Sequence, residues 1–190
     1  SAELMPDGWL TLEKPEYGEA FHASYTWTWM HKTEEFYKQQ LSIDTLDVVL
    51  KKYDDLGDST MRAWFTTNHD ENSWNGTEYE KYGDMAKALA VFSATWNGVP
   101  LLYSGQELPN QKRIEFFDKD TISWTGNNLL HDFYKTLLRL KTNNPALRGG
   151  DTTVKTFHIK TTHPKQIFAY IRKSGDREVL IVLNLSSQKN

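Results

Sequence analysis

Polar side chains that can exchange protons or form strong hydrogen bonds gather directly after an apolar run. The run is 64–67, and the polar residues that follow it are Asn68, His69, Asp70, Glu71 and Asn72. The apolar run suits a covered β-strand. An imidazole beside carboxylates can hydrogen-bond a substrate or exchange a proton with it. The alternative is that Asp70 and Asn72 merely cap the next helix, where such residues are common.

A second polar pair, Gln106 and Glu107, follows another short apolar run. In parallel α/β folds, functional groups lie at the C-terminal ends of the strands because the loops converge there. Two polar clusters at equivalent strand ends therefore predict one shared site. Within it we expect Gln106 and Glu107 to fix loops beneath the site rather than to touch a substrate.

Predicted strands alternate with long amphipathic helices before residue 148. The strands are expected at 20–30, 61–67 and 99–105. The helices are expected at 42–58, 77–98 and 128–147. This alternation indicates parallel strands joined by right-handed crossovers. The charges within 78–84 are expected to form a solvated helix face.

The pattern changes near residue 148, where we place a domain boundary. Strand-like runs follow at 152–160, 166–175 and 177–185, with a hairpin turn at Ser174-Gly175-Asp176. The chain therefore divides into a parallel α/β part, 1–147, and an antiparallel β part, 148–190. Each part resembles a fragment of a larger domain. The outer strands of a parallel sheet need to be covered, and a sheet of three antiparallel strands is only marginally stable alone.

Composition excludes several classes of function. The net charge of the 190 residues is −3 with no basic block, so no nucleic-acid partner is expected. No membrane association is expected, since no apolar run approaches the roughly 20 residues of a membrane span. There are no cysteines, which excludes thiolate metal sites and leaves the compartment open. Aromatic residues make up 13%, and such rings either pack a core or offer flat platforms to ligands that include sugars.

Four segments, in order, resemble the α-amylase family of glycoside hydrolases. FTTNHDEN, 65–72, resembles the family's seventh-strand motif, and GVPLLYSGQE, 98–107, resembles its eighth-strand segment. FFDKDTISW, 116–124, resembles the segment that follows, and YKTLLRLKTNNPAL, 134–147, resembles the last barrel helix. The resemblance implies a partial (β/α)8 barrel, about strands six to eight with their helices, then a truncated antiparallel β-domain. Residues 20–30 would be the sixth strand.

The resemblance also implies retaining hydrolysis of α-glucosidic bonds in starch, maltooligosaccharides or related α-glucans. Such enzymes use one carboxylate as nucleophile and another as acid/base, about 5–5.5 Å apart. A third carboxylate comes from the seventh strand and corresponds to Asp70, whose implied role is to hydrogen-bond the distorted sugar and stabilise the transition state. His69 and Asn68 would contact the same sugar. Trp74 and Tyr79 would either stack on a glucose ring or pack the loop.

The other two carboxylates of the family are not found in this sequence. The Gly-x-Arg-x-Asp pattern that carries the nucleophile is absent, and Thr11 stands where the acid/base Glu is expected. Glu3 and Glu13 are nearby but lie in no recognisable motif. We therefore expect this chain to keep sugar contacts but to be inactive alone.

Two alternatives remain open. The chain is either part of a sugar-cleaving enzyme or a non-catalytic, sugar-binding or structural piece whose barrel edges drive self-association or pairing with the missing barrel half. An unrelated α/β hydrolase lacks support because no Gly-x-Ser-x-Gly elbow is present. No cofactor is expected. Calcium is possible in a longer parent enzyme, but the domain through which family members bind it is lacking here.

Overall fold

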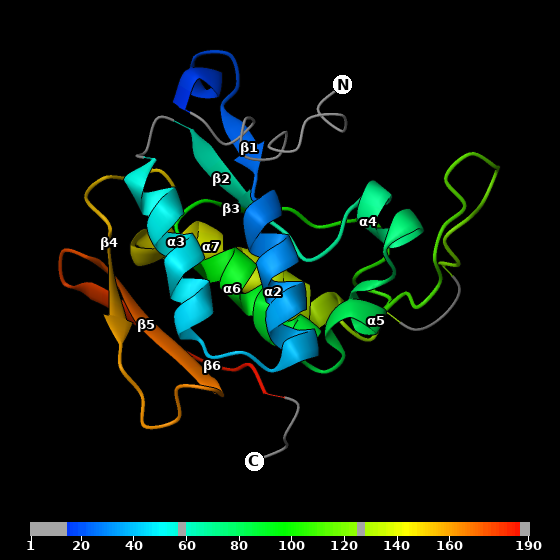
Figure 1. Cartoon of the computed structure of the whole chain (residues 1–190). Helices are drawn as coiled ribbons and strands as arrows, with labels where there is room; N and C mark the ends of the chain where they lie inside the picture. The colour runs from blue at the N-terminus through cyan, green and yellow to red at the C-terminus, as the bar shows by residue number, and fades with distance from the viewer. Residues whose placement is uncertain (1–14, 57–59, 125–127, 187–190) are drawn as a thin grey trace.

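The computed structural model describes residues 15–56, 60–124 and 128–186 of the chain. A parallel sheet contains β1 (Ala23–Tyr25), β2 (Met61–Trp64) and β3 (Val99–Pro100), in that order (Figure 1). The register pairs Tyr25 with Ala63 and Ala63 with Val99. The predicted parallel arrangement is confirmed, although each strand is shorter than its predicted range.

The strand predicted over 20–30 is present only at Ala23–Tyr25, and the prediction was wrong for the residues that follow. The strand ends at Tyr25, and α2 (Trp27–Gln39) begins immediately after the next residue. Trp27, Met30 and Thr33 are buried at the spacing of one helix face. Aromatic side chains suit a strand as well as a buried helix, so the alternation of Tyr25 and Trp27 did not distinguish the two.

The other helices of the parallel part either fall within the predicted helical ranges or form short turns of helix in segments outside them. They are η2 (Pro15–Glu19), α3 (Asp44–Asp55), α4 (His69–Trp74), α5 (Glu78–Tyr82), α6 (Met85–Thr95), α7 (His131–Asn143) and η3 (Pro145–Leu147). None of the helices in the described ranges is long and apolar enough to cross a membrane.

The single helix predicted over 77–98 is two helices. Gly83 separates them with a φ of +50°, and a Cβ at this position would lie 2.3 Å from Tyr37 Oη. The predicted apolar stripe is nevertheless buried throughout, at Tyr82, Met85, Leu89, Phe92 and Trp96. The break therefore changes the direction of the chain while the same side chains still face the core.

An antiparallel sheet follows, with β4 (Lys155–Ile159), β5 (Ile167–Ser174) and β6 (Arg177–Asn184) in that order. Ser174 pairs with Arg177, so Gly175 and Asp176 form the predicted hairpin turn. Gly175 has a φ of +56°, as such turns require.

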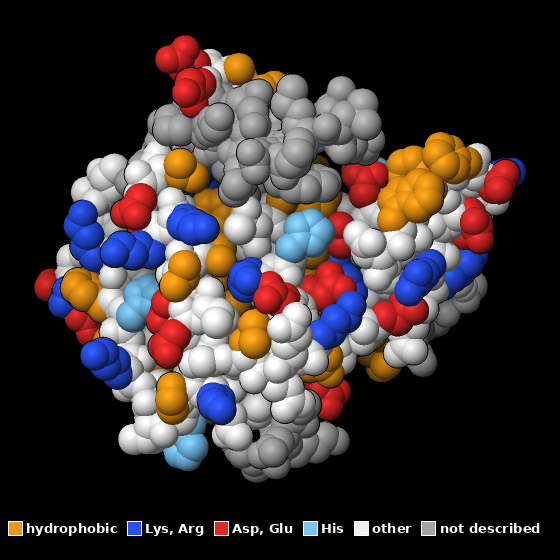
Figure 2. Space-filling view, viewed as in Figure 1, with side chains coloured by type: hydrophobic (Ala, Val, Ile, Leu, Met, Phe, Trp, Pro, Cys, Tyr) orange, Lys and Arg blue, Asp and Glu red, His pale blue; other side chains and the backbone are white. Residues whose placement is uncertain are grey.

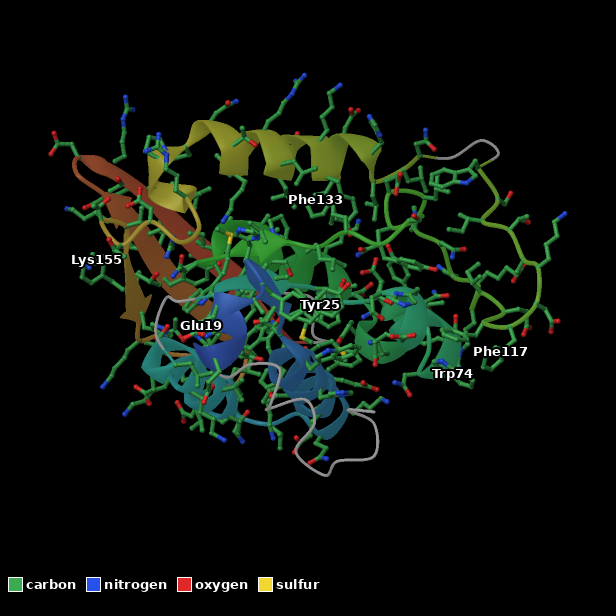
Figure 3. The ribbon with its side chains drawn as sticks, turned by 90° about the horizontal axis from the view of Figure 1, so that it is seen from above. Glu19, Tyr25, Trp74, Phe117, Phe133 and Lys155 are labelled. Atoms are coloured by element: carbon green, nitrogen blue, oxygen red, sulfur yellow. The ribbon has the colours of Figure 1, made fainter. Side chains whose placement is uncertain are left out.

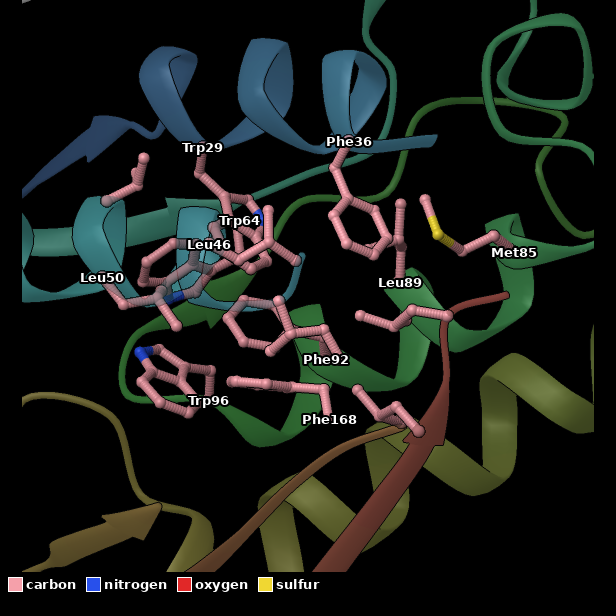
Figure 4. Packing of buried hydrophobic residues seen from close by; sticks show 14 of the residues in the cluster. Trp29, Phe36, Leu46, Leu50, Trp64, Met85, Leu89, Phe92, Trp96 and Phe168 are labelled. Carbon is pink, nitrogen blue, oxygen red and sulfur yellow. The ribbon is translucent and has the colours of Figure 1, made fainter. Parts of the chain in front are cut away.

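One hydrophobic core joins the helices of the parallel part to this second sheet. The rings of Phe92 and Trp29 stack with centroids 4.3 Å apart, and Trp96 lies 5.0 Å from Phe92. Thr95 Oγ1 and Tyr170 Oη are 2.6 Å apart in a buried hydrogen bond. Figure 4 shows α6 lying between α2 and the antiparallel strands. The boundary near residue 148 stays a prediction, and side chains from both of its sides share this core.

Candidate active site

His69 and Asp70 lie side by side at the C-terminal end of β2. They form the first turn of α4, whose N-cap is Asn68, and Asn68 Oδ1 accepts a hydrogen bond of 2.8 Å from the Glu71 backbone N–H. His69 Nε2 is 3.5 Å from Asp70 Oδ1, and the two side chains are 63% and 42% exposed. An imidazole and a carboxylate this close, both open to solvent, can hydrogen-bond hydroxyl groups of one ligand.

Asn68 occupies a different position. Its side chain is buried and its oxygen is committed to the cap, while its Nδ2 has no hydrogen-bond partner among the described residues. The structure thus brings His69 and Asp70 to the surface and keeps Asn68 beneath them. The alternative in which Asp70 and Asn72 cap the helix is wrong, because Asn68 is the cap.

Asn72 fastens the loop between β3 and α7 onto α4. Its Oδ1 accepts a hydrogen bond of 2.8 Å from Ile114 N, and its Nδ2 donates one of 3.3 Å to Lys112 O. Arg113 in the same loop pairs with Glu80, with Nε 3.0 Å from Oε2. These contacts hold the loop beside the helix that carries His69 and Asp70.

A buried ion pair joins α4 to α5. Lys81 Nζ lies 2.8 Å from Glu71 Oε2, and the two side chains are 0% and 4% exposed. Glu71 Oε1 also accepts a hydrogen bond of 2.9 Å from Asn75 Nδ2. The expectation of a solvated charged face over 78–84 was therefore wrong for Lys81, and it was wrong for Glu78 as well, which is also buried.

Glu78 lies in a hydrogen-bond network that joins the ends of β2 and β3. Its Oε2 accepts hydrogen bonds from Thr66 Oγ1 at 2.8 Å and from Gln106 Nε2 at 2.7 Å. Gln106 Oε1 accepts one of 2.6 Å from Tyr103 N. Burial raises the pKa of the Glu78 carboxyl, and the hydrogen bonds from Thr66 and Gln106 oppose that shift. The supporting role predicted for Gln106 rests on these contacts.

The remaining predicted residues are dispersed around this centre. Glu107 is half-buried, and it lines a cavity beside α7 together with Tyr103 and Trp124. Tyr79 is half-buried and packs against two apolar clusters, which matches the packing alternative for its ring. Trp74 is 57% exposed. Thr11, Glu3 and Glu13 lie outside the described residues. Within the described ranges, no three His, Asp or Glu side chains gather as a metal site would require.

Sequence reasoning named Trp74 but missed two exposed phenylalanines beside it, Phe116 and Phe117. The ring centroids of Trp74 lie 5.2 Å from Phe116 and 5.8 Å from Phe117. The His69 ring lies 6.4 Å from Phe116 and nearly parallel to it, at 15°. Figure 3 shows Trp74 and Phe117 together at the end of the molecule opposite Lys155. The feature of the sequence that could have indicated these rings is the pair of adjacent Phe residues within a charged segment, 112–120.

Curated relatives match most of this chain, and they include an α-amylase and a cyclomaltodextrin glucanotransferase. Alpha-amylase 2 of Dictyoglomus thermophilum is 23% identical over 169 residues, which cover 83% of this chain and 27% of the relative. Cyclomaltodextrin glucanotransferase of Geobacillus stearothermophilus is 30% identical over 148 residues, which cover 73% of this chain and 18% of the relative. The chain thus spans a minor part of the length of these relatives. No family model matches the chain.

Solved structures share the fold over nearly the whole chain. The maltogenic α-amylase AmyB of Thermotoga neapolitana superposes with a TM-score of 0.79 at 20% identity, over 96% of this chain and 46% of that one. An α-amylase of Lactobacillus plantarum superposes with a TM-score of 0.76 at 18% identity, over 92% of this chain and 40% of that one. The parallel sheet with its helices therefore corresponds to part of a (β/α)8 barrel. Sequence similarity and shared fold together show that the chain belongs to the α-amylase family and corresponds to its C-terminal region, the end of the barrel and the start of the β-domain.

Proposed function

We propose that the chain is the C-terminal part of a retaining enzyme that cleaves α-glucosidic bonds in starch, maltooligosaccharides or related α-glucans. The observation that carries the proposal is the exposed pair of His69 and Asp70 at the C-terminal end of β2, 3.5 Å apart. Their neighbours Asn68 and Glu71 are buried, so this pair is the part of the motif that a ligand can reach directly.

In this proposal Asp70 and His69 hydrogen-bond the hydroxyl groups of the sugar at the cleavage point. The sugar ring flattens as the transition state forms, and contacts that strengthen with this change lower the barrier rather than merely tightening binding. The buried Lys81–Glu71 pair and the Glu78 network keep the turn that bears Asp70 in place from below. The proposed barrel part is 1–147, and the β-domain begins at residue 148.

We further propose that this chain does not cleave a glucan by itself. Retaining cleavage requires a nucleophile and a separate acid/base carboxyl group. The sequence contains no Gly-x-Arg-x-Asp pattern to supply the nucleophile. Incubation of the purified chain with a maltooligosaccharide should release no shorter sugar. Turnover that disappears in Asp70→Asn would contradict this part of the proposal, and turnover that persists in this variant would indicate contamination.

The contact itself is tested by titrating maltose into the chain and following the imidazole proton NMR signals of His69, assigned with His69→Gln. We expect a saturable shift of these signals and none at His163, an exposed histidine in the loop between β4 and β5. Asp70→Asn should weaken the apparent affinity about 10-fold, since a hydrogen bond to a charged group is being reduced to a neutral one. Unchanged His69 signals at saturating maltose would refute the assigned contact.

A second candidate, a non-catalytic piece that associates with itself, is favoured by one observation. The outer edges of β1 and β3 have no partner strand among the described residues. Unpaired edges of a sheet are sites where another chain can add. Sedimentation velocity over a range of concentrations should show association in this case, and a monomer at all concentrations would exclude it.

A further inference from the structure

Two positively charged side chains lie near each other where α7 ends beside the antiparallel sheet (Figure 3). Lys141 belongs to the last turn of α7, and Arg172 lies on β5. Lys141 Nζ donates a hydrogen bond of 3.1 Å to Trp96 O, at the C-terminal end of α6. The ring of Tyr170, two residues before Arg172 and on the same face of β5, lies 4.7 Å from the Trp96 ring. Trp96 thus contacts both the helix that carries Lys141 and the strand that carries Arg172.

The guanidinium of Arg172 is buried, and its hydrogen bonding is incomplete. The residue is 1% exposed. Its Nη1 donates a hydrogen bond of 2.5 Å to Thr156 Oγ1, and its Nη2 donates one of 2.9 Å to Arg148 O. Its Nε has no hydrogen-bond partner among the described residues. Buried donors without a partner are rare in folded proteins, and a bound ion is one way in which they are satisfied.

No carboxylate in the described part of the chain offsets these two charges. Burial lowers the pKa of both groups, and the Arg172 guanidinium lowers that of Lys141 further, with no Asp or Glu side chain opposing either shift. The Tyr170 hydroxyl faces Arg172, but burial raises its own pKa, so it stays neutral. On the surface that Figure 2 shows, by contrast, Lys and Arg side chains lie among Asp and Glu side chains.

The chemistry of the two cations indicates what could bind between them. Carbonyl and hydroxyl oxygens supply partial charges only, and a buried cation without a counter-charge is strongly disfavoured. A carboxylate carries a full negative charge on two oxygens, so one oxygen can accept from Arg172 Nε and the other from Lys141 Nζ. Its planar shape also matches the guanidinium. Because Lys141 is half-buried, a small anion can reach the pair from its side.

We propose that Arg172 and Lys141 bind a small carboxylate anion at the junction of α7 and β5. The bound anion receives hydrogen bonds from a helix of the parallel part and from a strand of the antiparallel sheet, so it fastens one to the other. This site is separate from His69 and Asp70. Those residues lie on the side of Trp74 in Figure 3, whereas α7 ends at the antiparallel sheet.

The test follows thermal denaturation of the purified 190-residue chain in formate, the smallest carboxylate. It is made at about pH 6, because the pKa of Lys141 is lowered to about 7 and its amino group is mainly protonated below that value. Sodium chloride replaces formate in the reference samples at equal ionic strength. With a dissociation constant of about 5 mM, about 50 mM formate should shift the unfolding equilibrium about 10-fold toward the folded state, and the effect should saturate.

Variants separate binding at this site from a general effect of the salt. Lys141→Met should abolish the stabilisation by formate, since it removes one of the two cations. Lys135→Met is the matched control, because it removes a charge from an exposed position of the same helix, and the stabilisation should remain. The Nε–H signal of Arg172 in NMR spectra of the unaltered chain should shift as formate saturates. This readout requires no substitution of the buried Arg172.

Three results would overturn the proposal. They are equal denaturation midpoints in formate and chloride, a formate effect that persists in Lys141→Met, and an Arg172 Nε–H signal that does not move. Loss of the effect in Lys135→Met as well would also overturn it, because attraction to the charge of α7 in general would then explain the stabilisation. None of these results bears on the maltose titration, which reports on His69 and Asp70.

Discussion

Lys81 and Glu71 form an ion pair removed from solvent, with Nζ 2.8 Å from Oε2 and side chains 0% and 4% exposed. Glu71 directly follows the exposed Asp70 in α4, and Lys81 belongs to α5. The pair therefore anchors the turn that carries Asp70 to the body of the protein. Because neither charge can be solvated where it lies, each depends on the other.

Lys81→Met should lower the free energy of unfolding by about 3–5 kcal/mol, because it leaves the Glu71 carboxylate buried without its counter-charge. Urea denaturation followed by circular dichroism measures the change. Lys38→Met is the matched control, since Lys38 pairs with Glu34 on an exposed helix surface, and it should cost less than about 1 kcal/mol. Equal losses in the two variants would show that the Lys81–Glu71 pair contributes no more than a surface pair.

Asn72→Ala should release the loop between β3 and α7 from α4, because Ile114 N loses its partner and Lys112 O keeps only its bond from Asn110 Nδ2 within the loop. An unsatisfied group costs about 1–3 kcal/mol, so cleavage by trypsin after Lys112 or Arg113 should become about 10-fold faster. Mass spectrometry of a digestion time course gives the rate. Asn110→Ala changes contacts within the loop alone and should alter the rate less. A rate unchanged by Asn72→Ala would mean that other contacts hold the loop.

Lys141 should make stability depend on pH in the alkaline range. Burial, and secondarily the Arg172 guanidinium, lower the pKa of the Lys141 amino group to about 7 from an ordinary value of 10.5. Between these values the unfolded chain binds more protons than the folded one, so the free energy of unfolding rises with pH. Below about 7 this contribution is constant.

The comparison with Lys141→Met isolates this effect. The difference in unfolding free energy between the unaltered chain and the variant should increase from pH 7 to pH 10 in favour of the unaltered chain, as measured by urea denaturation. Lys87→Met, at an exposed position of α6, should show a flat difference. A flat difference for Lys141→Met as well would contradict the lowered pKa.

Gly98→Ala should destabilise the fold by at least about 3 kcal/mol, because both strain and overlap oppose a side chain there. Gly98 has a φ of +132°, and its Cβ would lie 2.3 Å from Arg62 O and 2.6 Å from Trp64 Nε1. Gly175→Ala is the control, since its φ of +56° is also left-handed but no atom lies within 4 Å. This variant should lose about 1–2 kcal/mol, from the backbone conformation alone. Thermal denaturation of both variants tests the ranking.

The parts of the fold that sequence patterns could predict are those with local causes. The stripe from Tyr82 to Trp96 has helical spacing and is buried, and the Gly175 turn follows from local turn chemistry. The parallel order followed from alternation of strands and helices. The helix beginning at Trp27 could not be separated from a strand, because its first residues are aromatic and alternate with polar ones.

The burial of charges near the site depends on distant partners and could not be predicted locally. Lys81 meets Glu71 ten residues away, and Glu78 meets Gln106 across 28 residues of sequence. Taken without these partners, the segment 78–84 has the composition of a solvated helix face. Asp70, by contrast, could be singled out from its position after a strand and from its motif. Its role as a sugar contact stays a prediction until the maltose titration is made.

The shared core has a consequence for how this region can be exchanged or inherited. Tyr170 of β5 and Thr95 of α6 join through their hydroxyl groups inside that core, and Phe168 lies against Phe92 and Trp96. The antiparallel sheet therefore packs against α6 as part of one shared core and is not a detachable module. A chimaera that takes its β-domain from another family member must take a matching face of α6 with it. Sequence changes on the two sides of residue 148 are expected to be accepted in pairs rather than singly.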